Sequence, residues 1–261
     1  LTFGLSAARS PAADRVRIGY TAPGPQHGLL WLGDTAGLFK KNNLDVEIIY
    51  MPGNISAPSL MAGEIQFGQM TGALMSPIRL QGGDPVMLVS VQELLDDRLV
   101  VRPNIKTPED LEDVPISVGY QSGSHYSTIQ ALEQYLPTER IKLSFNDGML
   151  FKRMELLLEG RVPAAALFSG PYYFAEQLGF RKIIDSTFMI TTMINGDPDP
   201  EDLRKFFRAL RKAQRDIDIS RVNAIQFVDA ALGADRRQLI KQYVENADGS
   251  PKLAERIWQA L

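Results

Sequence analysis

The pattern of apolar and polar positions gives this chain the same order of predicted elements twice. Residues 16–20 form a short apolar run typical of a buried strand, followed by a loop, a helix and a second strand at 46–51. Residues 115–120 begin the same way, and a loop, a helix and a strand at 141–145 follow them. Each copy then continues with a helix that ends at a glycine and with another strand. Two β-loop-α-β-α-β units in one chain predict two similar α/β lobes.

The chain has to pass between these units, and the predicted strands indicate where. We expect it to cross near 91–99 and to return near 186–194, because a tail of helices after two α/β units usually packs back on one lobe. Two crossing strands would form a hinge that lets the lobes open and close. The predicted first lobe comprises residues 14–92 and 190–261, the second comprises 93–189, and the ligand cleft lies between them.

Helical periodicity is clearest after the first loop and after the second unit. Near the start of the chain one helix is predicted to carry Leu29, Leu30, Leu32, Leu38 and Phe39, with Gly37 allowing it to end before Asn42. Beyond the second unit a long helix is predicted from its apolar positions, which are Leu203, Phe206, Phe207, Leu210 and Ala213. Further helices are expected near 224–232 and 236–246, and a short one ends at Trp258.

The composition narrows the function. The 261 residues are 44% hydrophobic and 23% charged, as in an ordinary globular protein, and the net charge of −3 argues against a nucleic-acid-binding surface. The sequence contains no cysteine, which removes disulfides and thiolate chemistry. Residues 1–8 resemble the end of a signal peptide, although a remnant of cloning would look similar. A signal peptide would place the protein outside the cytoplasm.

The loops that follow the predicted strands hold the candidate ligand-binding residues, since ligands of open α/β sheets bind beyond the carboxyl ends of the strands. The candidates are Gln26, His27, Trp31, Asn54, Ser56, Thr71, Gly72, Glu93, Ser122, Ser124, His125, Tyr126, Ser169 and Tyr172. Asn54, Ser56 and Ser124 could instead only cap helices, and Glu93 could be a solvated charge. Backbone N–H groups at 53–57 and 123–124 would favour an anion or an accepting oxygen.

The two histidines and the aromatic residues suggest how a ring could be held. His27 and His125 lie in equivalent loops of the two units, so they could meet across the cleft. Trp31 and Tyr172 are the best candidates for stacking on a flat ring, and Glu93 could pair with an amine. No carboxylate or cysteine cluster completes a metal site, and no glycine-rich dinucleotide loop or P-loop occurs, so neither a metal nor a cofactor is predicted.

Several motifs point to one family. Residues 37–48 are similar to its pattern G-x-F-x-x-x-x-L-D-V-E, residues 60–68 to L-x-x-G-E-x-D-F-G, and residues 105–111 to I-K-T-P-x-D-L. In the second of these motifs Gln66 stands in place of the usual Asp. From residue 17 to residue 212 the chain resembles the SsuA/THI5-like (NMT1) family, the substrate-binding proteins of ABC importers for nitrate, sulfonate, taurine and thiamine pyrimidines.

The resemblance implies a type II periplasmic-binding-protein fold. It also implies a monomer, in the periplasm or lipid-anchored outside the cytoplasm, that delivers a solute to an ABC permease in the inner membrane without chemistry on it. Gln26-His27-Gly28 partly matches the Asn-His-x-Gly of the pyrimidine-binding branch, where the histidine contacts the ring.

The charge of the expected solute is inferred from the lack of Arg and Lys in the loops that follow the predicted strands. No Arg or Lys occurs in loops 21–30, 52–59, 121–128 or 168–173, which favours a neutral or weakly charged solute bearing a ring, similar to a pyrimidine or riboflavin. The first alternative is a sulfonate-, taurine- or nitrate-type anion. The second is a small-molecule biosynthetic enzyme on the same fold, with His27 or His125 as general base and Glu93 as its partner.

Overall fold

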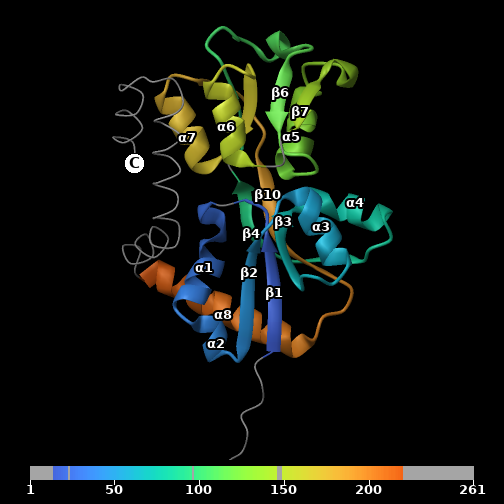
Figure 1. The fold of residues 1–261 in the computed structure, drawn as a ribbon, viewed down its shortest axis with the longest axis vertical. Helices are drawn as coiled ribbons and strands as arrows, with labels where there is room; N and C mark the ends of the chain where they lie inside the picture. Colours follow the sequence, from blue (N-terminus) through green and yellow to red (C-terminus); the bar gives the residue numbers. More distant parts are fainter. Residues whose placement is uncertain (1–13, 23, 96, 146–148, 220–261) are drawn as a thin grey trace, which may run out of the picture.

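The computed structural model describes residues 14–219, apart from 23, 96 and 146–148. It contains two β-sheets arranged end to end, each with helices around it (Figure 1). The helices predicted near 224–232 and 236–246, the short one ending at Trp258, and the predicted end of a signal peptide lie outside the described residues.

The lower sheet in Figure 1, sheet A, has five strands in the order β2-β1-β3-β10-β4. They are β1 (Asp14–Tyr20), β2 (Leu44–Tyr50), β3 (Phe67–Thr71), β4 (Pro85–Leu95) and β10 (Phe188–Asn195). β1 pairs in parallel with β2 and β3, whereas β10 pairs antiparallel with β3 and β4. The strand inserted between β3 and β4 is therefore the one that returns after the other sheet is complete.

Sheet B repeats this arrangement with the order β7-β6-β8-β5-β9. Its strands are β5 (Arg98–Val101), β6 (Pro115–Val118), β7 (Lys142–Phe145), β8 (Ala164–Leu167) and β9 (Arg181–Asp185). β6 pairs in parallel with β7 and β8, and β5 pairs antiparallel with β8 and β9. In each sheet the three parallel strands lie in the order second, first, third. The predicted repeat of two α/β units is confirmed.

Helices cover both faces of each sheet. Sheet A carries α1 (Gly28–Thr35), α2 (Leu38–Lys41), α3 (Gly53–Met61), α4 (Met75–Leu80) and α8 (Pro200–Ile219), with the 3₁₀ turns η1 (Pro25–His27) and η2 (Gly72–Leu74). Sheet B carries α5 (Gly123–Leu132), α6 (Leu150–Leu158) and α7 (Ser169–Gln177), with the turns η3 (Pro108–Leu111) and η4 (Thr138–Arg140). We call these two assemblies lobe 1 and lobe 2.

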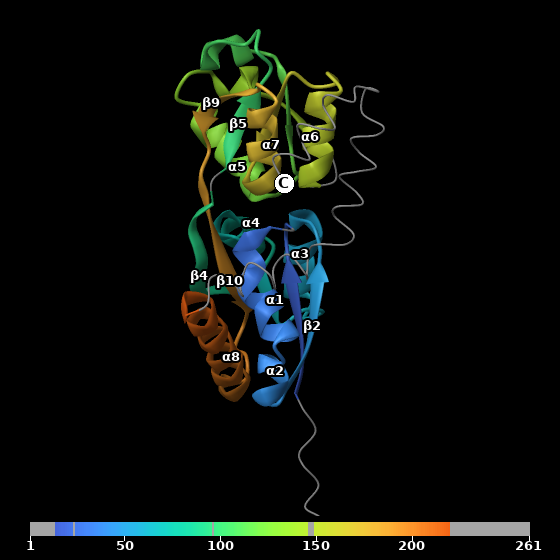
Figure 2. The ribbon, with the colours of Figure 1, turned by 90° about the vertical axis from the view of Figure 1, so that its left-hand side faces the viewer.

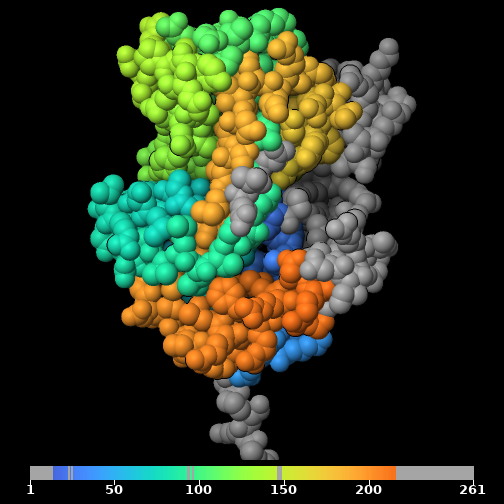
Figure 3. All heavy atoms as spheres, turned by 180° about the vertical axis from the view of Figure 1, so that it is seen from behind, coloured from blue at the N-terminus to red at the C-terminus, as the bar shows by residue number. Residues whose placement is uncertain are grey.

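The chain passes between the lobes twice, and the two crossings lie side by side. It leaves sheet A after β4 and enters sheet B at β5, and it returns between the end of β9 and the start of β10. Figures 2 and 3 show β4 and β10 running together along one side of the molecule from one lobe toward the other. This geometry is the two-strand hinge that the order of elements predicts.

One helix prediction needs correction. The sequence predicts a single helix through residues 29–39, but the chain forms two short helices, α1 and α2. Gly37 stands between them with φ of +66°, a left-handed conformation that glycine adopts without strain and that interrupts a right-handed helix. The glycine therefore separates two helices, whereas the prediction used it to end one.

Lobe 1 is held together by the last described helix. Phe206 of α8 stacks on Phe67 of β3 with ring centroids 4.3 Å apart and on Phe39 of α2 at 6.0 Å. Ala209, Leu210 and Ala213 continue this buried face, as the helical spacing predicts. No helix among the described residues is both long and apolar enough to cross a bilayer.

Candidate functional site

A small cavity lies between the two lobes, at the carboxyl ends of their parallel strands. Its volume is about 30 Å³. Lobe 1 contributes Thr21, Ala22, Gly53, Thr71, Leu74 and Ile190 to its lining, and lobe 2 contributes Ser122, Gly123, Ser124, Arg153 and Phe168. The crossings contribute Leu95, the last residue of β4, and Phe188, the first residue of β10. Ligand pockets usually measure about 300–1,000 Å³. The cavity therefore accommodates a compact polar group, and a larger solute needs the lobes to part.

The cation of the cavity is Arg153, which the sequence analysis missed. Its side chain comes from α6 and is almost fully buried, with 2% of the residue exposed. One guanidinium nitrogen, Nη1, donates hydrogen bonds to Ser124 Oγ (2.8 Å) and to the carbonyl oxygen of Ala166 (2.9 Å), and the guanidinium lies 5.9 Å from the centre of the Phe168 ring. Burial lowers the pKa of Arg153 to about 10, so it stays cationic at neutral pH.

The inference drawn from the loops was therefore wrong about the site. Those loops do lack Arg and Lys, but α6 brings a guanidinium to them from outside. A signal was present in the sequence, because Arg153 lies among the apolar residues Leu150, Met154 and Leu157 at helical spacing. A charge at an apolar position of an amphipathic helix faces the interior and needs a polar partner there.

Hydroxyl groups at the start of α5 surround the guanidinium. Ser122 Oγ donates to the carbonyl oxygen of Gly119 (2.7 Å) and lies 2.9 Å from Ser124 Oγ. Ser124 Oγ also accepts the hydrogen bond from Arg153. These contacts fix both serines at the wall of the cavity, next to the positive end of the α5 dipole. Guanidinium, hydroxyls and helix N-terminus together form an environment that favours negative charge.

Lobe 1 meets this wall through a glycine. A Cβ atom added to Gly53, at the start of α3, would lie 2.4 Å from the carbonyl oxygen of Gln121 in lobe 2. Tyr126 of α5 also packs against the apolar cluster around Met70 and Leu74 in lobe 1. The lobes are therefore in direct contact, and a side chain at position 53 would hold them apart.

Three of the predicted ligand residues line the cavity, and these are Thr71, Ser122 and Ser124. Gly72 follows Thr71 in η2, and Ser56 is buried in α3, where its hydroxyl donates to the carbonyl oxygen of Gly53 (3.3 Å). Among the described side chains, the lining lacks the candidates Gln26, His27, Trp31, Asn54, Ser56, Gly72, His125, Tyr126, Ser169 and Tyr172. The lining residues that the prediction lacked come mostly from helices and from β10, the returning strand.

His27 lies inside lobe 1 and away from the cavity. It is fully buried, and a hydrogen bond of 2.7 Å joins its Nδ1 to Gln69 Oε1. Its ring packs near Tyr20 and Trp31, with centroid distances of 5.2 and 6.4 Å. Burial lowers the pKa of His27 to about 4, so the ring is neutral. These contacts make His27 a part of the core beneath the strand ends.

His125 belongs to a separate aromatic cluster in lobe 2. Its ring stacks on Tyr120 and Tyr126 and meets Phe145 edge-on, at centroid distances of 5.9, 4.9 and 4.9 Å. Its Nδ1 accepts a hydrogen bond from the backbone N–H of Gln121 (3.2 Å), and burial lowers its pKa. The ring contacts of each histidine stay within its own lobe, so the structure does not bring the two rings together as predicted.

Two further candidates lie in α7. Ser169, its first residue, has φ of +53°, and Tyr172 is buried with its hydroxyl donating to Glu176 Oε1 (3.0 Å). Glu93 lies in β4, the strand that leads to the first crossing. None of the described residues forms a group of three or more His, Cys, Asp or Glu side chains that could hold a metal ion.

Solved structures share this architecture. SsuA from Xanthomonas axonopodis pv. citri, an alkanesulfonate-binding protein bound to MOPS, has a TM-score of 0.67 at 17% identity, covering 97% of this chain and 85% of that one. The aliphatic sulphonate-binding SsuA of Escherichia coli gives 0.65 at 20% identity, covering 96% and 91%. A protein from Bordetella bronchiseptica RB50 gives 0.71 at 16%, covering 95% and 89%.

This chain has the type II periplasmic-binding-protein fold. The likeness covers both lobes and the hinge, since 95–97% of the chain takes part in these three comparisons. No protein-family model matches the chain, and no curated protein does. At these identities the likeness describes the fold, whereas the solute depends on the residues of the cavity.

Proposed function

We propose that this chain is the solute-binding component of an ABC importer and a member of the SsuA/THI5-like (NMT1) family. It acts outside the cytoplasm, in the periplasm or lipid-anchored, as a monomer that hands its solute to a permease without chemistry on it. The fold, the polar cavity between the lobes and the sulfonate-binding structural neighbours support this proposal. The two histidines lie outside the cavity lining, so the enzyme alternative gains no support.

The solute carries an anionic headgroup of the sulfonate type, and the headgroup binds at Arg153. The buried guanidinium is the observation that carries this proposal. It replaces the neutral solute favoured by the sequence, because that preference depended on a site without cations. The N–H groups at the start of α5, and Ser124 once its hydroxyl turns from Ser122 to the solute, would donate the remaining hydrogen bonds to the anion.

A ring on the same solute is the second candidate. Tyr20 and Tyr50 end the strands β1 and β2, and their ring centroids are 5.6 Å apart. Burial raises the pKa of Tyr50 and the charge of Arg153 acts to lower it, so Tyr50 lies within electrostatic range of the cation. A pyrimidine- or riboflavin-like ring attached to an anion would find aromatic partners there once the lobes have opened.

Closure of the lobes completes the site in this proposal. Residues 14–92 and 190–261 act as lobe 1, and residues 93–189 act as lobe 2. Since the cavity lining is divided between them, ligand binding shifts an open ensemble toward the closed state.

Calorimetry on the purified protein tests the proposed solute class. We expect methanesulfonate, taurine or a longer alkanesulfonate to bind, and Arg153→Met to weaken the binding strongly while the protein stays folded. Binding of pyrimidines or riboflavin with no binding of any sulfonate would overturn the anionic headgroup. Turnover of a candidate solute by the protein alone would overturn the proposal of a binding protein.

A further inference from the structure

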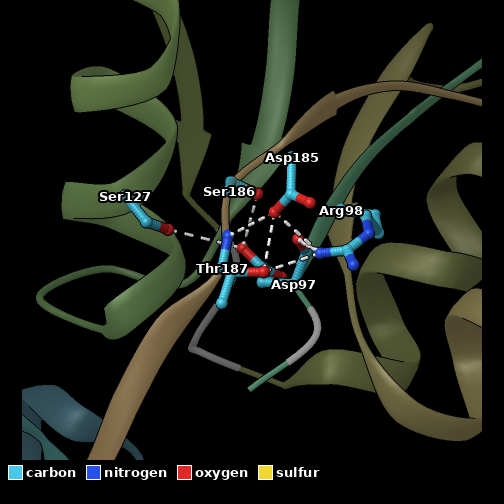
Figure 4. A network of polar contacts seen from close by, with 6 residues as sticks. All are labelled: Asp97, Arg98, Ser127, Asp185, Ser186 and Thr187. Atoms are coloured by element: carbon cyan, nitrogen blue, oxygen red, sulfur yellow. Dashed lines mark hydrogen bonds and ion pairs between the residues drawn. The ribbon is translucent and has the colours of Figure 1, made fainter. Parts of the chain in front are cut away.

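A buried carboxylate lies at the point where the two crossings meet. Asp97, between β4 and β5, is completely buried, and its Oδ2 accepts hydrogen bonds from Ser186 (3.0 Å) and Ser127 (3.4 Å) (Figure 4). The backbone N–H of Ser186, in the other crossing, donates to the carbonyl oxygen of Asp97 (3.1 Å). The second carboxylate oxygen, Oδ1, has no hydrogen-bond partner among the described residues. The hinge therefore encloses a carboxylate that is only partly satisfied.

The same helix links Asp97 to the cation of the cavity. Ser124 of α5 accepts from Arg153, and Ser127, three residues later, donates to Asp97. Residues three apart lie on one face of a helix with Cβ atoms about 5–6 Å apart. Leu95, two residues before Asp97, lines the cavity together with Arg153. The serine that binds Asp97 therefore lies about one helical turn along α5 from the serine that binds Arg153.

The charged groups around Asp97 have opposite effects on its ionisation. Arg153 of α6 favours the ionised carboxylate, and Asp185 of β9 disfavours it. Arg98 of β5 is directed to the hinge backbone and to Asp185, with Nη1 donating to the carbonyl oxygen of Asp97 (2.9 Å) and to Asp185 Oδ1 (2.8 Å). Burial outweighs the attraction and raises the pKa of Asp97 to about 7. Its charge therefore changes within the physiological pH range.

We infer that Asp97 sets the charge of the solute that the cavity accepts. The inference rests on the proposed anion site at Arg153. When Asp97 is ionised its negative charge opposes that of the guanidinium, so the cavity accepts a monoanion and rejects a dianion. When a monoanion binds, its charge offsets Arg153 and repels Asp97, so the carboxylate takes up a proton from the solvent. The protein therefore takes up as much as one proton for each anion that it binds.

Calorimetry with methanesulfonate and with sulfate tests this inference. For the wild-type protein, the affinity for methanesulfonate should fall roughly tenfold from about pH 6 to about pH 8, because each unit of pKa shift on binding corresponds to a tenfold change. Titrations in two buffers with different heats of ionisation should show proton uptake. Asp97→Asn should bind methanesulfonate with little dependence on pH and should gain roughly tenfold in affinity for sulfate at about pH 8.

Ser186→Ala is the matched control, because it removes a hydrogen bond at the same hinge and keeps the carboxylate. Its affinity should still depend on pH. If methanesulfonate binds to the wild type with an affinity that is constant over this range, or if Asp97→Asn keeps the slope, the inference fails while the proposed anion site stands. If neither anion binds to the wild type, both proposals fall together.

Discussion

Replacing Gly53 by alanine should disfavour closure of the lobes without damaging either lobe. The added Cβ would lie 2.4 Å from the carbonyl oxygen of Gln121, which belongs to the backbone and cannot rotate away as a side chain can. A carbon and an oxygen in contact normally lie about 3.3–3.6 Å apart, so the lobes would have to separate by about 1 Å at this point. Gly53 does not have a positive φ, and alanine suits the start of a helix, so lobe 1 itself should tolerate the change.

The magnitude follows from the cost of overpacking, which is about 1–3 kcal/mol for a group forced into filled space. Because only the closed state bears this cost, the apparent affinity for the solute should fall roughly 5- to 150-fold while the thermal stability of the free protein stays unchanged. Calorimetry measures the affinity, and small-angle scattering should show that a higher solute concentration is needed to decrease the radius of gyration.

Gly170→Ala provides the matched control, because a Cβ there meets only the Phe174 ring at an ordinary distance of 3.7 Å. It should bind and close as the wild type does. If Gly53→Ala binds the solute with wild-type affinity and compacts normally, the contact between the lobes is not part of the binding-competent state.

Three further predictions concern buried polar groups. Arg153→Met should weaken methanesulfonate binding by about 2–5 kcal/mol, as loss of a buried charged partner does, whereas Arg153→Lys should retain part of it; equal affinities of the two variants would contradict a role for the charge. Since the pKa of Asp97 is raised to about 7, the folded state keeps a proton that the unfolded chain loses near pH 4, and stability is lost as the pH rises from about 4 to about 7. Chemical denaturation at several pH values gives the free energy of unfolding of the wild type and of Asp97→Asn. The wild type should lose at most about 1.4 kcal/mol per pH unit relative to the variant, and an equal dependence on pH in both proteins would refute this prediction. His27→Ala should lower the free energy of unfolding by about 1–3 kcal/mol, because it leaves Gln69 buried without its partner. Its solute affinity should change little; unchanged stability with weakened affinity would place His27 in the site.

The fold could be predicted from the sequence because its signals are local and occur twice. The strand and helix periods at 16–20 and 115–120 define the same unit in each lobe, and the apolar spacing from Leu203 to Ala213 identifies the helix that packs on lobe 1. The break at Gly37 was harder to predict, since a glycine can end one helix or separate two. Tertiary packing of both short helices against α8 decides between these outcomes.

Only those residues of the candidate site that lie at the ends of strands could be predicted from the sequence. Thr71, Ser122 and Ser124 follow parallel strands, and the rule for open sheets places them in the cavity. Arg153 enters from a helix that begins well after those loops, so its position depends on how α6 packs. Gln69, which comes from another strand, holds His27 within the core. Helical spacing places Arg153 toward the interior, but no periodic signal shows which cavity it reaches or that Gln69 pairs with His27.

A crystal structure of the protein with a bound alkanesulfonate would test the anion site at Arg153 most directly. The sulfur gives an anomalous signal that locates the headgroup independently of the rest of the solute. We expect the headgroup between the lobes, within hydrogen-bond distance of Arg153 and Ser124, with Gly53 of lobe 1 closing over it. A sulfonate bound entirely within one lobe, or bound between the lobes without contact to Arg153, would contradict it.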